Sequence, residues 1–172
     1  PSGWSISPSM RGASRSSVIG DRAFARDPRI VSLLARSLMQ GLLQAGMANC
    51  GKHFPGHGDV AVDSHYDLPL INKSMSQLDS MELVPFRALF SAGVGSVMIA
   101  HLSIPAIDNT ANKATSISKN NVTDLLRIKM GYEGLTFTDA LEMKGVTKYF
   151  PGGTIAAEAL VAGNDMLCLP AS

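Results

Sequence analysis

The stretch RDPRIVSLLARSLMQGLLQAGMANCGKHF, residues 26–54, contains one complete helix–strand unit. Apolar side chains recur every three or four positions as far as Gly46, which is helical spacing. Asp27 followed by Pro28 is typical of a helix start, and a glycine directly after the last apolar turn is typical of a helix end. We therefore expect a helix between Asp27 and Gly46 that leads directly into a strand over 47–54.

The same order, a helical segment closed by glycine and then a short apolar strand, recurs three more times. In the second helical segment, Ser76 and Asp79 form an S-x-x-D pattern that predicts the cap, and Pro85 is expected to kink or split the helix. The expected helices cover 76–93, 118–131 and 154–163, and the expected strands cover 94–102, 134–141 and 164–170.

Alternating helices and strands predict an α/β fold with a parallel sheet. The first strand ends at Lys52 and His53, the second at His101 and the third at Asp139. Polar side chains at the carboxyl ends of parallel strands are typical of the active site of a (β/α)8 TIM barrel, and also of an open doubly wound sheet. Four units are half of the eight that a barrel needs, so the chain is expected to form an open sheet or an incomplete barrel.

Composition narrows the possible partners. The formal net charge is +1, which predicts no basic field for nucleic acid. No apolar run approaches the roughly 18 residues that span a membrane, and two cysteines are too few for a disulfide framework. Residues 1–17 are rich in Ser, Gly and Arg without periodicity, so we expect a disordered or junction segment there, separate from a catalytic unit over 18–172.

The stretch KHFPGHGDVAVDSHYDLP, residues 52–69, holds three of the four histidines of the chain. Asp63 stands two positions before His65, and a carboxylate that close can fix the tautomer of an imidazole for general acid/base catalysis near neutral pH. Asp63 could instead cap a turn and leave His65 as an ordinary polar loop residue, which is the commoner case for a D-x-H spacing. Spacing alone does not decide between these two interpretations.

Other polar groups of the chain also admit two interpretations. Lys52 and His53 could bind hydroxyl or carboxylate groups of a ligand, or could be a surface lysine and a histidine bonded to the loop backbone. Asp139, at the end of the apolar stretch GLTFTD, could act as a nucleophile, as a base or as a helix cap.

The residue types in the histidine-rich stretch are also those that zinc accepts as ligands. Pro55 and Gly56, however, exclude the helix that would place the first two histidines on one face, so we expect no metal site. The side chains concerned are His53, His57, Asp59, Asp63 and His65.

KHFPGHGD followed by DSHYDLP resembles glycoside hydrolase family 3, and within it the bacterial β-N-acetylhexosaminidases. GYEGLTFTDALEMKGV is similar to the nucleophile strand of that branch, which usually reads F-S-D-D-L-x-M. VIGDRAFARDP is similar to the D-R-S-F-G-x-D-P motif of the family, and SVMIAHLSIPAID and AGNDMLCLP are similar to its later strands. The resemblance extends over 18–170.

The resemblance implies a retaining exo-β-N-acetylglucosaminidase that removes terminal β-linked N-acetylglucosamine, here from peptidoglycan fragments, without a metal or an organic cofactor. It implies that Asp139 is the nucleophile and that His65, paired with Asp63, is the acid/base. The positions matching the sugar-binding residues of the family are Arg22, Lys52 and His53.

The chain also departs from the family pattern. Ala140 stands where a second aspartate is common, and the strands that precede D-R-S-F in the family have no counterpart here. The resemblance thus implies about the C-terminal half of a barrel, with the remainder missing. A phosphorylase of the same sugar, a β-glucosidase and a non-catalytic sugar-binding fragment remain alternatives. The family has cytoplasmic recycling enzymes and exported members, so the compartment stays open.

Overall fold

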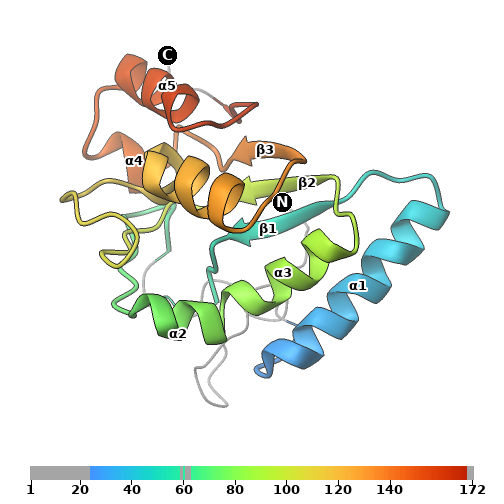
Figure 1. Cartoon of the computed structure of the whole chain (residues 1–172). Coiled ribbons are helices and arrows are strands. Elements are labelled where there is room, and N and C mark those ends of the chain that lie inside the picture. The colour runs from blue at the N-terminus through green and yellow to red at the C-terminus, as the bar shows by residue number, and fades with distance from the viewer. Residues whose placement is uncertain (1–23, 59, 61–62, 170–172) are drawn as a thin grey trace.

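The structure is a computed structural model that describes residues 24–58, 60 and 63–169 of the 172-residue chain (Figure 1). The predictions for residues 1–17 and for Arg22 therefore lie outside the described residues, as does Asp59. Within the described part, no helix is both long enough and apolar enough to cross a lipid bilayer.

A parallel three-stranded sheet forms the centre of the molecule. It consists of β1 (Cys50–Phe54), β2 (Ser96–Ile99) and β3 (Leu135–Thr138), in the order β1-β2-β3. Ser96 is the Cα partner of both Cys50 and Leu135, so the three strands start level with one another. The three arrows point the same way in Figure 1, and the loops that follow them gather at that end. The prediction of an α/β fold with a parallel sheet is confirmed.

The predicted fourth strand over 164–170 is wrong for the described residues, where only an isolated bridge joins Met166 to Phe137. Backbone hydrogen bonds join Met166 to Thr136 and Thr138, but side chains take the positions on either side of this bridge. The carboxylate of Asp165 accepts the Thr136 N–H at 2.7 Å, and the Cys168 N–H donates to the Thr138 hydroxyl at 3.0 Å. Because a strand ladder needs backbone partners at these places, pairing stops after one bridge.

The first helix has the predicted boundaries. Helix α1 covers Pro28–Gln44, and the Asp27 carboxylate caps it by accepting the Arg29 N–H at 2.8 Å. Gly46 has φ +72°, a left-handed conformation that favours glycine just beyond a helix end.

The predicted second helix is split into α2 (Met75–Ser80) and α3 (Leu83–Ser91), with Pro85 in the first turn of α3. The split was predicted, but the cap was not. Ser74 and Gln77 form the capping box of α2 instead of Ser76 and Asp79. Asp79 is engaged elsewhere, because its carboxylate binds Arg87 and approaches Lys129.

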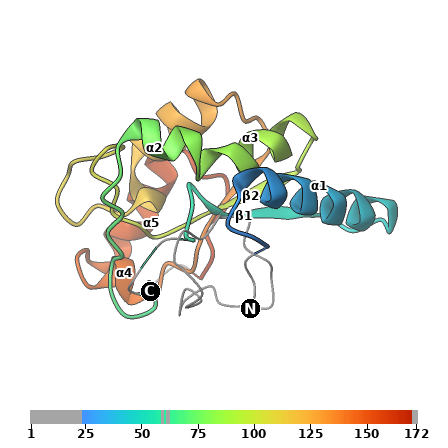
Figure 2. The same cartoon turned by 90° about the horizontal axis from the view of Figure 1, so that it is seen from below.

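The remaining helices follow β2 and β3. They are the 3-10 turn η2 (Thr115–Ile117), the π-helix η3 (Asn120–Lys129), α4 (Lys144–Thr147) and α5 (Gly152–Val161). Figures 1 and 2 agree that α2, α3 and the amber helix η3 lie on one face of the sheet, while α1 runs along α3 beyond the β1 edge.

The main core lies between the sheet and these helices. Phe54 of β1 and Phe86 of α3 are fully buried and meet edge to face with ring centroids 5.1 Å apart. Val31, Ala35 and Met39 are the buried residues of α1. A second, smaller cluster packs α5 against η2 and the segment after β3; its fully or nearly fully buried members are Ala114, Ile117, Leu141, Val146, Ile155 and Ala159.

The outward face of α1 is unusually apolar. Leu33 is 66% exposed, and other large apolar side chains of α1 are at least 40% exposed beside it. They are Ile30, Leu34, Leu38 and Leu43. Large apolar side chains exposed together on one helix favour association in water.

We predict that the isolated 172-residue chain self-associates through this face of α1. Replacing Leu33 and Leu38 with lysine should shift the chain towards the monomer, because the lysine ammonium groups oppose burial of this face. Lysine and leucine have similar helix propensities, so α1 itself should be kept. Light scattering after gel filtration measures this. Gln40→Lys, an exposed polar position on α1, is the matched control. An unaltered mass in the double variant would contradict the prediction.

Candidate active site

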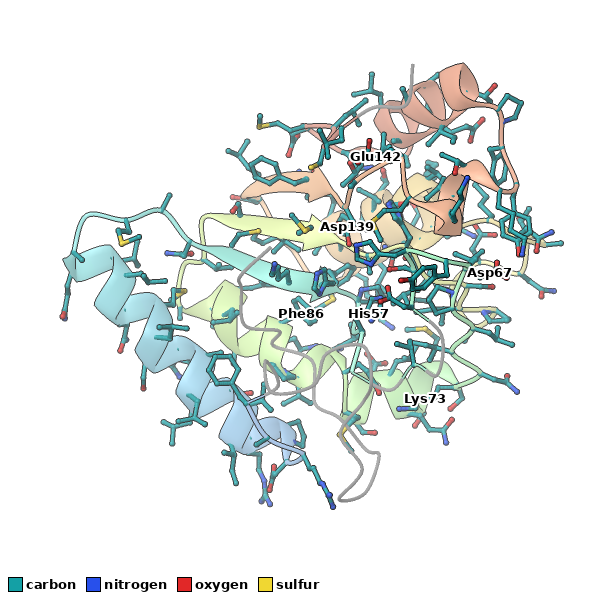
Figure 3. All side chains as sticks on the ribbon, turned by 180° about the vertical axis from the view of Figure 1, so that it is seen from behind. His57, Asp67, Lys73, Phe86, Asp139 and Glu142 are labelled. Atoms are coloured by element: carbon teal, nitrogen blue, oxygen red, sulfur yellow. The ribbon has the colours of Figure 1, made fainter. Side chains whose placement is uncertain are left out.

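The ends of β1 and β3 bring a histidine and a carboxylate together. His53, in β1, is buried, and its Nε2 lies 4.0 Å from Oδ2 of Asp139, which follows β3. Figure 3 shows Asp139 and His57 at the same end of the sheet. Lys52 is half-buried on the same strand. One predicted binding residue, His53, therefore lies beside the predicted nucleophile, and another, Lys52, precedes His53 in β1.

Asp139 is held from two sides. Its backbone N–H donates to the Ile99 carbonyl at 2.8 Å, and its Oδ1 accepts the Ala140 N–H at 2.9 Å. Oδ2 is left facing His53. The next helix, α4, begins at Lys144 with Met143 at its N-cap, so Asp139 does not cap it. Of the three roles considered for Asp139, the helix cap is thereby excluded.

Asp63 and His65 form the predicted pair. Oδ1 of Asp63 lies 2.7 Å from Nδ1 of His65 and also accepts the His65 backbone N–H at 3.0 Å. Burial opposes ionisation of Asp63, but these bonds outweigh it and hold the pKa of Asp63 below its usual value. Because an ionised carboxylate only accepts hydrogen bonds, Nδ1 of His65 carries a proton. The carboxylate thus caps the turn and orients the ring at once.

The His65 ring is largely exposed, with 61% of its side chain accessible. The pair Asp63–His65 has no hydrogen bond or ion pair to Asp139 within the described part of the chain. With Nδ1 occupied by Asp63, Nε2 is the ring atom left for proton exchange with a ligand. The structure therefore has two separate groups near the carboxyl ends of the strands. One is the Asp139 carboxylate beside His53, and the other is the exposed His65 on the adjoining loop.

The loop that follows β1 and carries His57 and His65, called the histidine loop below, is held in place by its own contacts. The buried His57 places Nε2 3.3 Å from the hydroxyl of Ser64, the neighbour of His65, and its ring centroid lies 5.5 Å from that of His53. The described residues contain no group of three His, Cys, Asp or Glu side chains that could hold a metal ion.

A buried ion pair lies under the start of this loop. Lys73 binds Glu82, whose side chain is 1% exposed. A Cβ added at Gly56 would come within 2.7 Å of Cβ and Cγ of Glu82, and Gly56 has φ +142°. Both observations make glycine necessary at this position, because a larger residue would lift the loop from Glu82.

A second set of contacts fixes the far end of the loop. The Asp67 carboxylate accepts hydrogen bonds from Lys148 Nζ and the Tyr149 hydroxyl, both at 2.6 Å. Gly145 donates its N–H to the Ser64 carbonyl at 3.0 Å, and a Cβ at Gly145 would lie 2.9 Å from that oxygen. The segment that follows Asp139 therefore holds the loop that carries His65 in place through these hydrogen bonds. Sequence reasoning missed these residues, because 81 positions separate Asp67 from Lys148.

The bonds from Lys148 and Tyr149 lower the pKa of Asp67 to about 2 from 3.8. Because the pKa of Asp67 is lower in the folded chain than in the unfolded chain, its ionised carboxylate stabilises the fold at any pH above the unfolded-state pKa. This stabilisation is lost as the pH falls through the folded-state pKa. We expect Asp67→Asn to lower the Tm at pH 7, with the difference from the wild type shrinking from about pH 4 towards pH 2.

Thermal unfolding followed by circular dichroism between pH 2 and pH 7 measures this difference. Glu133→Gln changes an exposed carboxylate before β3 and serves as the control. A difference in Tm between Asp67→Asn and the wild type that stays constant across this range would show that the charge of Asp67 is not what holds the loop.

Comparisons with known proteins identify the family. The model of the glycosyl hydrolase family 3 N-terminal domain matches residues 4–172. A beta-hexosaminidase from Chromobacterium violaceum is 46% identical over 153 residues, which are 89% of this chain and 42% of that protein. One from Nitrosospira multiformis is 42% identical and matched over 90% of this chain and 44% of its own length.

A solved structure gives the same result. The family 3 β-N-acetylglucosaminidase from Paenibacillus sp. superposes with a TM-score of 0.86 at 36% identity, covering 96% of this chain and 30% of that one. The chain thus spans less than half the length of the curated relatives that it matches. The family match, the identity and the strand-end geometry agree, and the chain belongs to glycoside hydrolase family 3.

Proposed function

We propose that the protein carrying this chain is a retaining exo-β-N-acetylglucosaminidase that releases terminal β-linked N-acetylglucosamine from peptidoglycan fragments. The observation that carries the proposal is the placement of Asp139 beside His53, 4.0 Å away, with the Asp63–His65 pair on the adjoining loop. The names of the relatives, beta-hexosaminidase and β-N-acetylglucosaminidase, support this substrate class. The resemblance of the sequence motifs supports peptidoglycan fragments as the source.

The one-sided arrangement of the sheet supports a barrel. In a (β/α)8 barrel the helices cover the outer face of the strands, and the active site lies at their carboxyl ends. Helices α2, α3 and η3 lie on one face here (Figure 2). His53 lies near the carboxyl end of β1 and Asp139 directly follows β3. We infer that residues 18–172 form the C-terminal part of such a barrel, with the remaining strands supplied elsewhere.

In the first step, Oδ2 of Asp139 attacks the anomeric carbon of the sugar. A bond forms between Oδ2 and that carbon while the bond to the leaving oxygen breaks. The proton on Nε2 of His65 passes to the leaving oxygen. Before this transfer the ring is an imidazolium, which Asp63 stabilises through its hydrogen bond with Nδ1. The Ala140 N–H holds Oδ1, which keeps the attacking oxygen on the side of His53.

In the second step, water replaces the aspartyl ester. Nε2 of His65, now unprotonated, takes a proton from the water as its oxygen bonds to the anomeric carbon, and the bond to Asp139 breaks. Two displacements at one carbon return the original β configuration. Lys52, His53 and Arg22 bind sugar hydroxyl groups in this proposal; Arg22 lies outside the described residues. The proposal includes no metal and no organic cofactor.

The two roles of His65 predict a leaving-group effect in the complete protein. A dinitrophenyl leaving group needs little protonation, whereas a sugar leaving group needs it strongly. His65→Ala should therefore slow the first step far more for a disaccharide, by about 10²–10⁴-fold, than for the aryl substrate. Because the second step lacks its base with either substrate, the aryl substrate should show a burst followed by slow turnover.

Pre-steady-state release of the phenol and steady-state rates on both substrates measure these effects. Asp139→Asn is the comparison variant and should abolish turnover whatever the leaving group. Asp63→Asn should give a milder form of the His65→Ala pattern, since it leaves the ring present but poorly oriented. Equal losses on both substrates without a burst would assign the acid/base role to another residue.

A further inference from the structure

His101 is a fully buried histidine at the carboxyl end of β2. Its Nε2 lies 2.9 Å from the carbonyl oxygen of Ala140, and its Nδ1 lies 2.7 Å from the hydroxyl of Ser116. Its Cβ would lie 3.5 Å from a Cβ at Gly145, in the segment that grips the histidine loop. His101 thus lies between Ala140, which follows Asp139, and Gly145, which bonds to the histidine loop. The proposed chemistry has no step for this histidine.

The hydrogen-bond partners define the tautomer of His101. A carbonyl oxygen only accepts, so Nε2 carries the proton that is shared with Ala140. Burial lowers the pKa of His101, which the Asp139 charge partly opposes and the charges of His57 and His65 reinforce. The ring is therefore neutral, Nδ1 has no proton, and the Ser116 hydroxyl donates to it.

Ala140 connects this ring to the carboxylate of Asp139. Its carbonyl accepts the His101 Nε2–H, and its own N–H donates to Oδ1 of Asp139 at 2.9 Å. The carboxylate is thus oriented by a backbone group of a residue that His101 holds in place. A shift of Ala140 would turn Oδ1, and with it the opposite oxygen that faces His53.

We propose that His101 is a positioning residue for the glycosidase reaction, which acts through Ala140 to aim the Asp139 carboxylate at the anomeric carbon. The proposal rests on the proposed function, because it assigns Asp139 the attacking role. A displacement of about 1 Å at a reacting group can cost about 10²-fold in rate, so a hydrogen bond that fixes this turn bears directly on the first step.

Two substitutions of similar size separate the two bonds of the ring in the complete protein. His101→Gln places an amide N–H near the position of Nε2, so it can still donate to Ala140 but loses Ser116. His101→Asn places its amide near the position of Nδ1, so it keeps Ser116 and loses Ala140. The measurements are kcat and KM on an aryl and a disaccharide N-acetylglucosaminide, together with the Tm of each variant.

We expect His101→Asn to lower kcat by about 10²-fold with little change in KM, and His101→Gln to retain most of the activity. The loss should be equal on the two substrates, unlike the loss in His65→Ala, because protonation of the leaving group is untouched. Equal activity of the two variants, or activities that simply follow their Tm values, would reduce His101 to a packing residue and overturn the proposal.

Nitrogen-15 NMR of the wild-type histidines gives a second measurement that needs no variant to fold. We expect His101 to carry its proton on Nε2, with Nδ1 unprotonated, at pH 7. A proton on Nδ1 at that pH would overturn the proposal. A wild type that turns over neither substrate would refute the proposed function itself, whereas an active wild type with equal variants would refute only the role of His101.

Discussion

The parallel pairing of β2 with β3 is the constraint on which the candidate site depends. The strands stay in register from Ser96–Leu135 to Ile99–Thr138, and the Asp139 N–H extends the ladder by one bond to the Ile99 carbonyl. Because parallel strands end at the same edge, this bond fixes the carboxylate beside the end of β1. A slip of one residue would turn the Asp139 side chain to the opposite face of the sheet.

The histidine loop needs more than the sheet to hold its shape. It returns to the same edge where Ile71 donates to the Ser103 carbonyl at 2.9 Å and Ser103 donates to the Pro69 carbonyl at 2.8 Å. Glu82 supports the loop from below at Gly56, and Asp67 fixes its far end. His65 is thus exposed on a loop that is anchored at both ends, which suits a group that meets substrate from solvent.

Much of this arrangement could be predicted from the sequence. Asp27, Pro28 and Gly46 mark the ends of α1 through local backbone chemistry, and the apolar runs mark three strands. The residues at strand ends, His53 and Asp139, were found because parallel strands bring their carboxyl ends together. The spacing of Asp63 and His65 is also a local signal, since two residues suffice for one carboxylate oxygen to meet both the backbone and the ring.

The rest depends on contacts between distant segments, which periodicity does not encode. The loss of the fourth strand follows from Asp165 accepting the Thr136 N–H, and the shifted cap of α2 follows from the engagement of Asp79 by Arg87. Predicting the tautomer of His101 requires knowing that the carbonyl of Ala140, 39 residues away, accepts a hydrogen bond from Nε2. Local sequence patterns single out these side chains, but tertiary packing determines which groups they bind.

Identifying the residue that carries the covalent intermediate tests the proposed mechanism. The complete protein is incubated with 5-fluoro-N-acetylglucosaminyl fluoride, digested and analysed by mass spectrometry. We expect one fluorosugar attached to the peptide containing Asp139, and no label in Asp139→Asn. Label on another carboxylate, or a turnover-competent protein in which Asp139 is never labelled, would contradict it.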